Sequence, residues 1–279
     1  MNEPFPTRQT ARDLLQRIAA NPVEGRPSEM RAAFARLAGP QPALKQLDVG
    51  GVRCVIAGSG APAAIWLHGG GYVFGGAESH GNTVLHLAER LGGPVLMPLY
   101  ARAPSRTWPA QRDDALAVLD RMPRSMPVIG DSAGGHLALH VAFARPGRVS
   151  DLVLISPNTD RTGRNTTRAE NSARDPMNDD TDDAHLASLA MPDAAPDSVD
   201  ASPRLGPLHR LPRTYITYAE NEVLAGDGAL LAEAASKAGV AVTRHVEQEL
   251  MHMWTLWPQA LPAAGRTLDR IADWIHDGA

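Results

Sequence analysis

The sequence has very little cysteine, no long hydrophobic run and no excess of positive charge. Cys54 is the only cysteine among 279 residues, which excludes an intramolecular disulfide and any multi-cysteine metal site. The formal net charge is −4, with Lys and Arg scattered among acids, so the sequence predicts no nucleic-acid or anionic-membrane partner. No stretch approaches the ~20 apolar residues of a membrane span.

The first residues, Met1–Pro6, lack both the basic and the apolar regions of a secretory signal, which predicts a cytoplasmic protein. A chain of this length suits one α/β domain with a modest accessory segment. We expect a small-molecule partner, and a homodimer is compatible with the sequence.

Strand-like and helix-like segments alternate along most of the chain. The runs 44–49 and 52–57, separated by Gly50 and Gly51, predict an antiparallel hairpin. Beyond them, the alternation predicts an α/β fold with a mostly parallel sheet and helices on both faces. The expected strands are 64–67, 94–99, 127–129, 152–155, 214–218 and 240–246, and the expected helices are 81–91, 109–122, 136–144, 227–238 and a closing helix that buries Leu268, Ile271 and Ile275.

Two segments interrupt this core, which is expected to comprise residues 41–160 and 209–279. Residues 1–40 carry two amphipathic helix patterns. Residues 161–208 lose periodicity, apart from a short helical piece near 185–189, and a stretch of this length is typical of a functional insertion. Its acidic run, 179–183, lacks the spaced ligands of a calcium loop and indicates a solvated face or a helix start, not a metal site.

The strongest functional pattern is MPVIGDSAGG at residues 126–135. A short apolar run ends at Gly130-Asp131-Ser132-Ala133-Gly134, the G-x-S-x-G pattern, and a helical stretch follows. Strand, sharp turn and helix form the context of a nucleophile elbow, in which flanking glycines avoid a Cβ collision. The pattern predicts Ser132 as a nucleophile.

A second glycine-rich segment, His68-Gly69-Gly70-Gly71, follows the expected strand 64–67. Its glycines let backbone N–H groups approach a substrate oxygen closely, as the other half of an oxyanion hole does. Either motif alone is compatible with ordinary turn glycines, but the two in this order predict an acyl-transfer site.

A nucleophilic serine needs a histidine base and an acid, which follow it in that fold in the order Ser, acid, His. His252 lies in a loop after the last strand, whereas the other histidines, apart from His68 of the glycine-rich segment, fall on helices, in or beside the insertion, or within a strand. The sequence predicts His252 as the base.

The loop after strand 214–218 offers Glu220, Glu222 and Asp227 as the acid. Glu222 is favoured because it stands a few residues beyond the strand. Glu220 still falls in the strand register, and Asp227 suits the start of the next helix. A surface salt bridge is the alternative role for Glu222.

These motifs, HGGG at 68–71, GDSAGG at 130–135, the acid loop at 219–224 and His252, resemble the bacterial hormone-sensitive-lipase family of α/β-hydrolases. The segment YARAP at 100–104, then Trp108-Pro109-Ala110 and Asp114, resembles that family's YRLAP…FPA…D pattern. The resemblance runs from about residue 60 to the C-terminus. It implies an α/β-hydrolase fold with a small cap, and hydrolysis of carboxylic esters without a cofactor.

The resemblance also assigns roles to individual residues. It makes Ser132, Glu222 and His252 the catalytic positions, and 1–40 with 161–208 the cap over the acyl site. The oxyanion donors it implies are the amides of Gly70, Gly71 and Ala133, in a loop supported by His68 and Gly69.

The sequence departs from the family pattern at several positions. The usual acid is aspartate, here Glu222, and the glycine that commonly follows the base is Met253. Ala101 replaces an arginine and Ser105 replaces a glutamate, so an ion pair near the floor of the site is either missing or rebuilt by Arg102. These changes affect the shape of the pocket rather than the reaction.

Bulky side chains cluster beside the predicted site and should line it. They favour an apolar acyl group by ~0.8 kcal/mol per buried CH₂, but a bounded pocket predicts a preference for short chains, about C2 to C6. The expected lining residues are Tyr72, Phe74, Met30, Phe34, Met253 and Trp254.

Two other functions fit the same framework. One is an amide or formamide hydrolase resembling an arylformamidase, because acyl transfer to serine does not distinguish an ester from an activated amide. The other is a non-catalytic ligand-binding receptor. Such a receptor would be expected to lack the serine or the histidine, and this chain has both.

Overall fold

The computed structural model describes residues 7–278, so the Met1–Pro6 segment that suggested the compartment lies outside it. Within that range, eight strands form one sheet in the order β1-β2-β4-β3-β5-β6-β7-β8. β1 and β2 pair antiparallel, as do β2 and β4, and the other neighbours run parallel. The predicted hairpin and mostly parallel sheet are therefore confirmed. The strands are β1 (Lys45–Val49), β2 (Val52–Ala57), β3 (Ala64–Leu67), β4 (Val95–Pro98), β5 (Met126–Asp131), β6 (Val149–Ile155), β7 (Arg213–Ala219) and β8 (Val242–Glu247).

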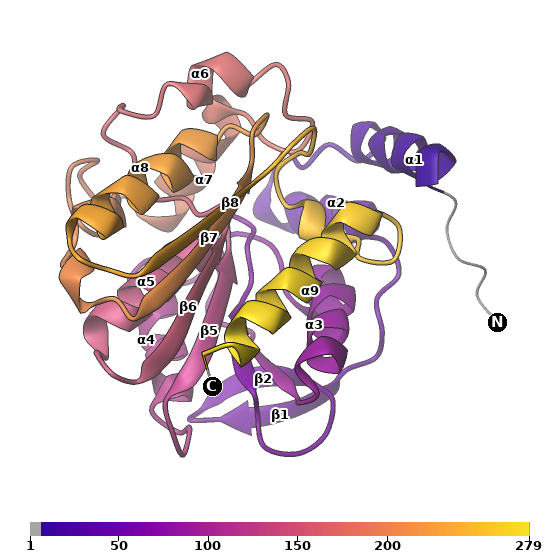
Figure 1. Cartoon of the computed structure of the whole chain (residues 1–279). Coiled ribbons are helices and arrows are strands. Elements are labelled where there is room, and N and C mark those ends of the chain that lie inside the picture. Colours follow the sequence, from indigo (N-terminus) through magenta and orange to yellow (C-terminus); the bar gives the residue numbers. More distant parts are fainter. Residues whose placement is uncertain (1–6, 279) are drawn as a thin grey trace.

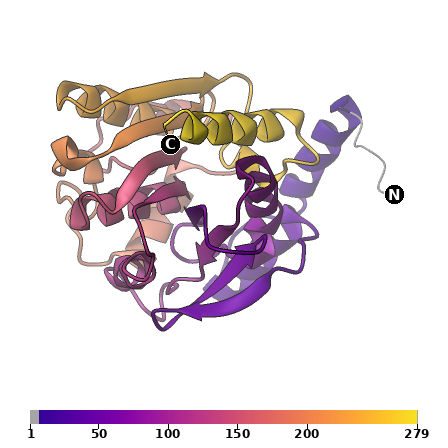
Figure 2. The same ribbon diagram turned by 60° about the horizontal axis from the view of Figure 1, so that its bottom comes forward.

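Helices cover both faces of the sheet (Figure 1). Two of them, α3 (Ala77–Leu91) and α9 (Pro262–His276), pack on one face. The opposite face is covered by α4 (Ala110–Leu119), α5 (Ala133–Ala144) and α8 (Ala225–Lys237). Figure 2 shows the β1–β2 hairpin at one edge of the sheet and β8 at the other. Strands such as β5 are buried on both faces, which explains their continuous apolar sequences.

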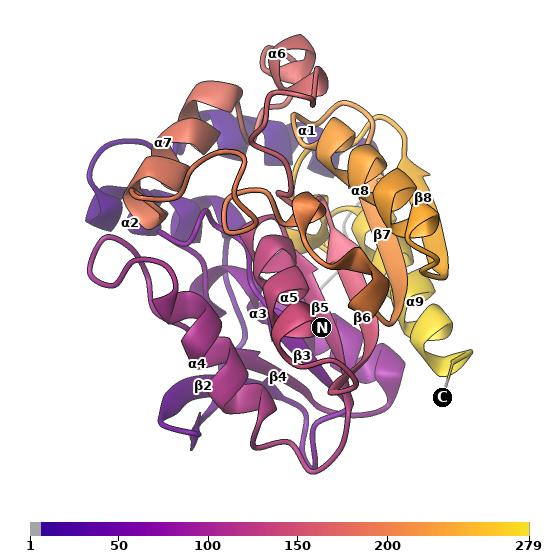
Figure 3. The same ribbon diagram turned by 90° about the vertical axis from the view of Figure 1, so that its left-hand side faces the viewer.

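The remaining α-helices gather at one end of the sheet (Figure 3). They are α1 (Thr7–Ala19), α2 (Pro27–Ala38), α6 (Thr167–Asn171) and α7 (Asp180–Ala190), the last two within residues 161–208. Short 3-10 turns occur at η1 (Pro203–Leu205), η2 (Leu208–Arg210) and η3 (Trp254–Leu256). None of the helices in residues 7–278 is both long and apolar enough to cross a bilayer.

The segment 161–208 holds more helix than its sequence predicts. Its acidic run starts α7, where the Asp179 side chain accepts a hydrogen bond from the Asp182 N–H, so the helix-start interpretation is confirmed. Asp183 is buried and pairs with Arg161 and Arg168. Ion pairs of this kind stabilise segment 161–208. Because they involve charged side chains, they produce no periodic pattern of apolar residues in the sequence.

Two helices begin three or four residues earlier than predicted. Helix α3 begins at Ala77 instead of residue 81, and α5 begins at Ala133 instead of residue 136. The extra first turn of α5 contains Gly134 and Gly135, which have low helix propensity. Close packing of that turn against neighbouring backbone outweighs the propensity, because a Cβ at Gly134 would overlap the Leu67 carbonyl.

Candidate active site

Ser132 occupies a sharp turn between β5 and α5. Its φ of 53° and ψ of −119° are strained for a residue with a Cβ. The turn is held by the Ser132 N–H, which donates to the Ile155 carbonyl at 2.9 Å, and it requires small neighbours. A Cβ on Gly130 would overlap the Gly134 carbonyl, so the G-x-S-x-G glycines follow directly from the geometry.

His252 brings the serine and the acid loop together. Its Nε2 lies 2.9 Å from the Ser132 Oγ, and its Nδ1 lies 3.0 Å from the Glu222 Oε2. A carboxylate accepts hydrogen bonds, so this pairing places the imidazole proton on Nδ1 and leaves Nε2 to accept the serine proton. All three side chains are buried.

The Glu222 carboxylate controls the ionisation of the histidine. Burial alone would lower the pKa of His252, but the hydrogen bond and the charge of Glu222, aided by Asp175 and Asp183, raise that pKa above its ordinary value. Glu222 is itself oriented by the Ser156 hydroxyl, which donates to Oε2 at 2.6 Å. The carboxylate therefore holds the ring and favours its charged form.

The two rival carboxylates are engaged elsewhere. Asp227 is buried in the first turn of α8 and accepts hydrogen bonds from the N–H groups of Thr159 and Asp160 at 2.6 and 2.8 Å. Glu220 lies at the surface, where its Oε1 accepts from the Glu249 N–H at 3.3 Å. Of the three acids considered, only Glu222 contacts His252.

The glycine loop after β3 passes beside the elbow. Gly70 and Gly71 have φ angles of 111° and 58°, a region open mainly to glycine. Gly71 and Ala133, the residue after the nucleophile, line the same small cavity. The backbone of this loop can thus approach a carbonyl oxygen held near Ser132.

His68 and Gly69 anchor this loop from behind. The Tyr100 hydroxyl donates to the His68 carbonyl, and the two rings stack with centroids 4.2 Å apart. Burial lowers the pKa of His68 to about 3, so the ring is neutral and its Nδ1 donates to the Gly69 carbonyl at 2.9 Å. The Gly69 N–H donates to the Asp131 Oδ1 at 3.0 Å. These contacts hold His68 and Gly69 directly before Gly70 and Gly71.

Comparisons with known proteins agree with this arrangement. Residues 64–256, more than half of the chain, match a family described as having the α/β hydrolase fold. The chain is 32% identical to esterase LipU of Mycobacterium tuberculosis, over 77% of each chain. It is 31% identical to an acetyl-hydrolase of Streptomyces hygroscopicus, over 74% of this chain and 72% of the relative.

Solved structures are similar along nearly the whole chain. A hormone-sensitive lipase from a metagenome library superposes with a TM-score of 0.87 at 26% identity, covering 99% of this chain and all of that one. An esterase of the bacterial hormone-sensitive-lipase family has a TM-score of 0.90 over 98% of this chain and 99% of its own, although its 24% identity bears on the fold alone. The chain belongs to the bacterial hormone-sensitive-lipase family of α/β-hydrolases. The resemblance read from the motifs is confirmed.

The structure shows how this member of the hormone-sensitive-lipase family accommodates Met253. Met253 has φ 57° and ψ 27°, a left-handed conformation that explains why glycine is common after the base. Its side chain lies against the glycine loop: a Cβ built on Gly69 would overlap the Met253 Cε.

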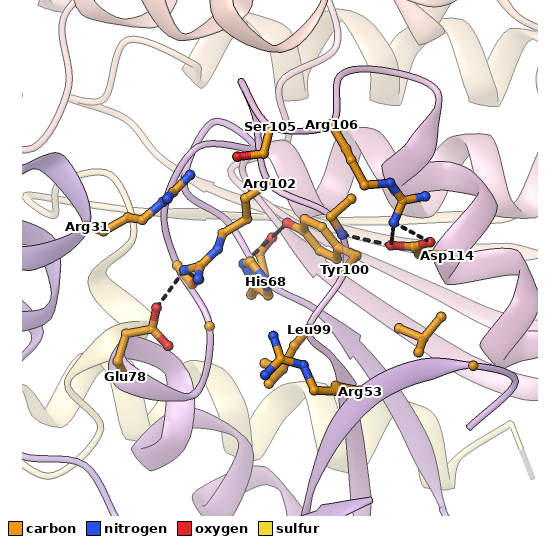
Figure 4. A pocket seen from close by; sticks show the side chains of 15 residues that line it. Arg31, Arg53, His68, Glu78, Leu99, Tyr100, Arg102, Ser105, Arg106 and Asp114 are labelled. Atoms are coloured by element: carbon orange, nitrogen blue, oxygen red, sulfur yellow. Dashed lines mark hydrogen bonds and ion pairs between the residues drawn. The ribbon is translucent and has the colours of Figure 1, made fainter. Parts of the chain in front are cut away.

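The family's ion pair cannot form at Ala101 and Ser105, and the neighbouring Arg102 makes a different ion pair. Arg102 pairs with Glu78 of α3 at 2.8 Å, and both side chains are about 35–41% exposed instead of buried. Arg31 of α2 donates to the carbonyls of Val73 and Ala103, each at 2.8 Å, and so joins the two segments. Figure 4 shows these side chains around a cavity of about 400 Å³ behind the oxyanion loop.

The residues expected to line the pocket fall into two groups. Tyr72 lines the cavity beside Gly71, and Phe74 lines a second cavity and packs on Phe34 with ring centroids 4.7 Å apart. Met30 is buried on α2. Trp254 does not join them: the η3 turn directs it into the core beneath α9, where its Nε1 donates to the Thr267 hydroxyl at 3.2 Å.

Sequence reasoning missed several residues around the site. Asp131 occupies a variable position of the G-x-S-x-G motif, so the motif assigned it no role. In the structure its buried carboxylate accepts a hydrogen bond from Trp66 Nε1 at 3.0 Å and lies 3.1 Å from His80 Nε2. Leu186 of α7 and Asp175 gave no signal, because the segment that carries them shows no regular pattern. Residues 7–278 contain no group of three or more His, Cys, Asp or Glu side chains placed to hold a metal ion.

Proposed function

We propose that this chain is a serine carboxylesterase that hydrolyses short-to-medium acyl esters through Ser132, His252 and Glu222. Its relatives are esterases, and membership of their family makes it a carboxylic-ester hydrolase. The observation that carries the proposal is the continuous pair of contacts from Ser132 Oγ through the imidazole to Glu222 Oε2, at 2.9 and 3.0 Å.

In the proposed reaction, Ser132 Oγ attacks the ester carbonyl while His252 Nε2 takes the hydroxyl proton. Glu222 keeps the proton on Nδ1 and stabilises the imidazolium that forms. The amides of Gly70, Gly71 and Ala133 bind the oxyanion, and each such donor is typically worth ~10²–10³ in rate. The imidazolium then protonates the departing alcohol. Water, activated by the same histidine, hydrolyses the acyl-enzyme.

A short acyl group suits the space beside the oxyanion glycines. The cavity lined by Gly71, Tyr72, Ala133 and Leu186 measures only about 10 Å³, roughly the room for one water. A second cavity of about 230 Å³ lies under α2 and the 161–208 segment. We propose residues 1–40 and 161–208 as the cap that limits chain length.

One experiment tests the triad and separates the alternatives. Ser132→Ala should abolish hydrolysis of p-nitrophenyl acetate and labelling by a fluorophosphonate, while the melting temperature changes little. Near wild-type activity of this variant would end the proposal. A matched p-nitroanilide, turned over faster than the ester, would indicate an amide hydrolase, and a wild-type protein that binds the ester without turnover would indicate a receptor.

A chain-length series tests the substrate range. The proposal expects kcat/KM for p-nitrophenyl esters to peak between about C2 and C6 and to fall by about C10. Activity that rises through laurate and palmitate would contradict the size limit.

A further inference from the structure

A third buried carboxylate, that of Asp175, touches both loops of the triad. Asp175 Oδ1 accepts hydrogen bonds from the N–H groups of His252 at 3.3 Å and of Met177 at 3.0 Å. Its Oδ2 accepts from the N–H of Val223, the residue after the acid, at 3.3 Å. One side chain therefore bridges the loop that follows β7 and the loop that follows β8.

A neighbouring residue, Asn171, forms hydrogen bonds with the carbonyl groups of the loop that carries Glu222. Asn171, at the end of α6, donates from Nδ2 to the carbonyls of Glu220 at 3.1 Å and Glu222 at 3.0 Å. The Asp175 N–H donates to the Asn171 carbonyl at 2.9 Å, so the two residues are directly linked. Together they satisfy both N–H and C=O groups of a buried loop, which would otherwise be costly.

We propose that Asp175 is a positioning residue of the esterase: the 161–208 segment uses it to hold the acid and base loops in register and to place a negative charge near the imidazole. The inference rests on the proposed triad. It gives the segment a role in catalysis that differs from covering the acyl site, because its contacts are to the backbone that carries the catalytic side chains.

The charges around Asp175 support an electrostatic contribution. Burial, followed by the charge of Glu222, raises the pKa of Asp175 to about 6, against the opposing effect of His252. The Asp175 charge in turn raises the pKa of His252. Glu24, Asp179 and Asp182 line the adjacent cavity with Asp175, and none of the described residues that line it is basic.

Protonation of Asp175 should weaken the hydrogen bonds that it accepts from the two loops. A carboxylate accepts from three N–H groups at once, whereas a protonated carboxyl carries a hydrogen on one oxygen and loses part of its capacity to accept. As the pH falls through about 6, the loops lose an anchor and His252 loses a neighbouring charge. Loss of the anchor lowers activity, as protonation of the base does, whereas loss of the charge lowers the pKa of His252 and moves the titration of the base to lower pH.

The test compares Asp175→Asn with Asp197→Asn, which removes the same charge from an exposed position of the same segment. In Asp175→Asn one of the two oxygens becomes an NH₂ group, which cannot accept a hydrogen bond. In either orientation of the amide, at least one backbone N–H therefore loses its acceptor. We expect kcat per fluorophosphonate-labelled site to fall about 10- to 100-fold, and the acid limb of kcat/KM to move to lower pH. Asp197→Asn should match wild type in both measurements.

A purely structural role predicts a different result. In that case Asp175→Asn would lower only the melting temperature, leaving kcat per labelled site and the acid limb unchanged, and the inference would be overturned. Asn171→Ala should lower kcat without moving the acid limb, because it removes an anchor and no charge. If Ser132→Ala is inactive while Asp175→Asn behaves as wild type, the triad stands and this inference alone fails.

The wild-type enzyme offers a check that needs no variant. Because Asp175 and His252 both titrate, the logarithm of kcat/KM should fall more steeply than a slope of one over part of the range below about pH 6. A slope of one down to about pH 4.5, in protein that remains folded, would contradict the proposal.

Discussion

The Asp131 carboxylate accepts a hydrogen bond of 3.0 Å from the Gly69 N–H, which ties the residue before Ser132 to the glycine loop 68–71. The same carboxylate accepts from Trp66 Nε1 and contacts His80 Nε2. Asp131 is only 1% exposed, so these bonds form away from competing water. The serine and the oxyanion glycines are thereby positioned as one unit.

Replacing this carboxylate should harm both stability and rate. Asp131→Ala leaves the buried Trp66 and Gly69 donors unpaired and is expected to lower the free energy of unfolding by about 3 kcal/mol. Asp131→Asn keeps one acceptor and should be milder. Urea unfolding with kcat for p-nitrophenyl acetate checks both, with the exposed Asp193→Ala as control. Equal behaviour of the Ala and Asn variants would show that the bond to Gly69 is unimportant.

The acid assignment can be tested with three matched variants. Glu222→Ala should lower kcat by about 10³- to 10⁴-fold, since the imidazole loses both its orientation and its charge partner. Glu220→Ala should stay close to wild type. Asp227→Ala should mainly reduce stability, because it uncovers the buried N–H groups of Thr159 and Asp160. A large loss of kcat in a fully folded Glu220→Ala variant would move the acid by two residues.

The pH dependence follows from the raised pKa of His252. Only the neutral imidazole accepts the serine proton, so kcat/KM should be high above this pKa and fall as the pH drops through it. Since the folded pKa is raised, the midpoint should lie above the ordinary 6.5. Glu222→Gln should move the midpoint down, because the charge that favours imidazolium is gone. A profile that is the same in wild type and Glu222→Gln would refute this coupling.

Leu186 should limit acyl length. A Cβ on Gly71 would meet this side chain, which lines the cavity of about 10 Å³ beside the oxyanion glycines. Leu186→Ala opens that cavity, so kcat/KM for octanoate relative to acetate should rise by about 10-fold, on the basis of ~0.8 kcal/mol per buried CH₂. Leu189→Ala, the same substitution on the same helix, should leave the ratio unchanged. An unaltered ratio in both variants would place the acyl group elsewhere.

Local sequence signals predicted the core of the molecule well. The apolar runs of β3 and β5, each followed by glycines, indicated the oxyanion loop and the elbow because such turns need residues without a Cβ. The amphipathic pattern of α9 gave its buried face. The placement of Trp254 in the pocket was wrong, because its side chain lies in the core. Its position in the chain near His252 does not determine the direction in which the η3 turn points that side chain.

The sequence by itself determined the main elements of the core, their order and the residue types of the site, because periodicity and glycine placement follow from backbone sterics; it did not determine the helices of segment 161–208. The sequence favoured Glu222 over Glu220 and Asp227 by its place in the loop, but only the tertiary structure shows that Glu222 meets His252 across 30 positions of chain. Only the tertiary structure brings the N–H groups of Met177, Val223 and His252 to Asp175. The physical reason is that a buried carboxylate needs hydrogen-bond donors or a cationic partner, and the meeting of distant groups is a property of the folded chain.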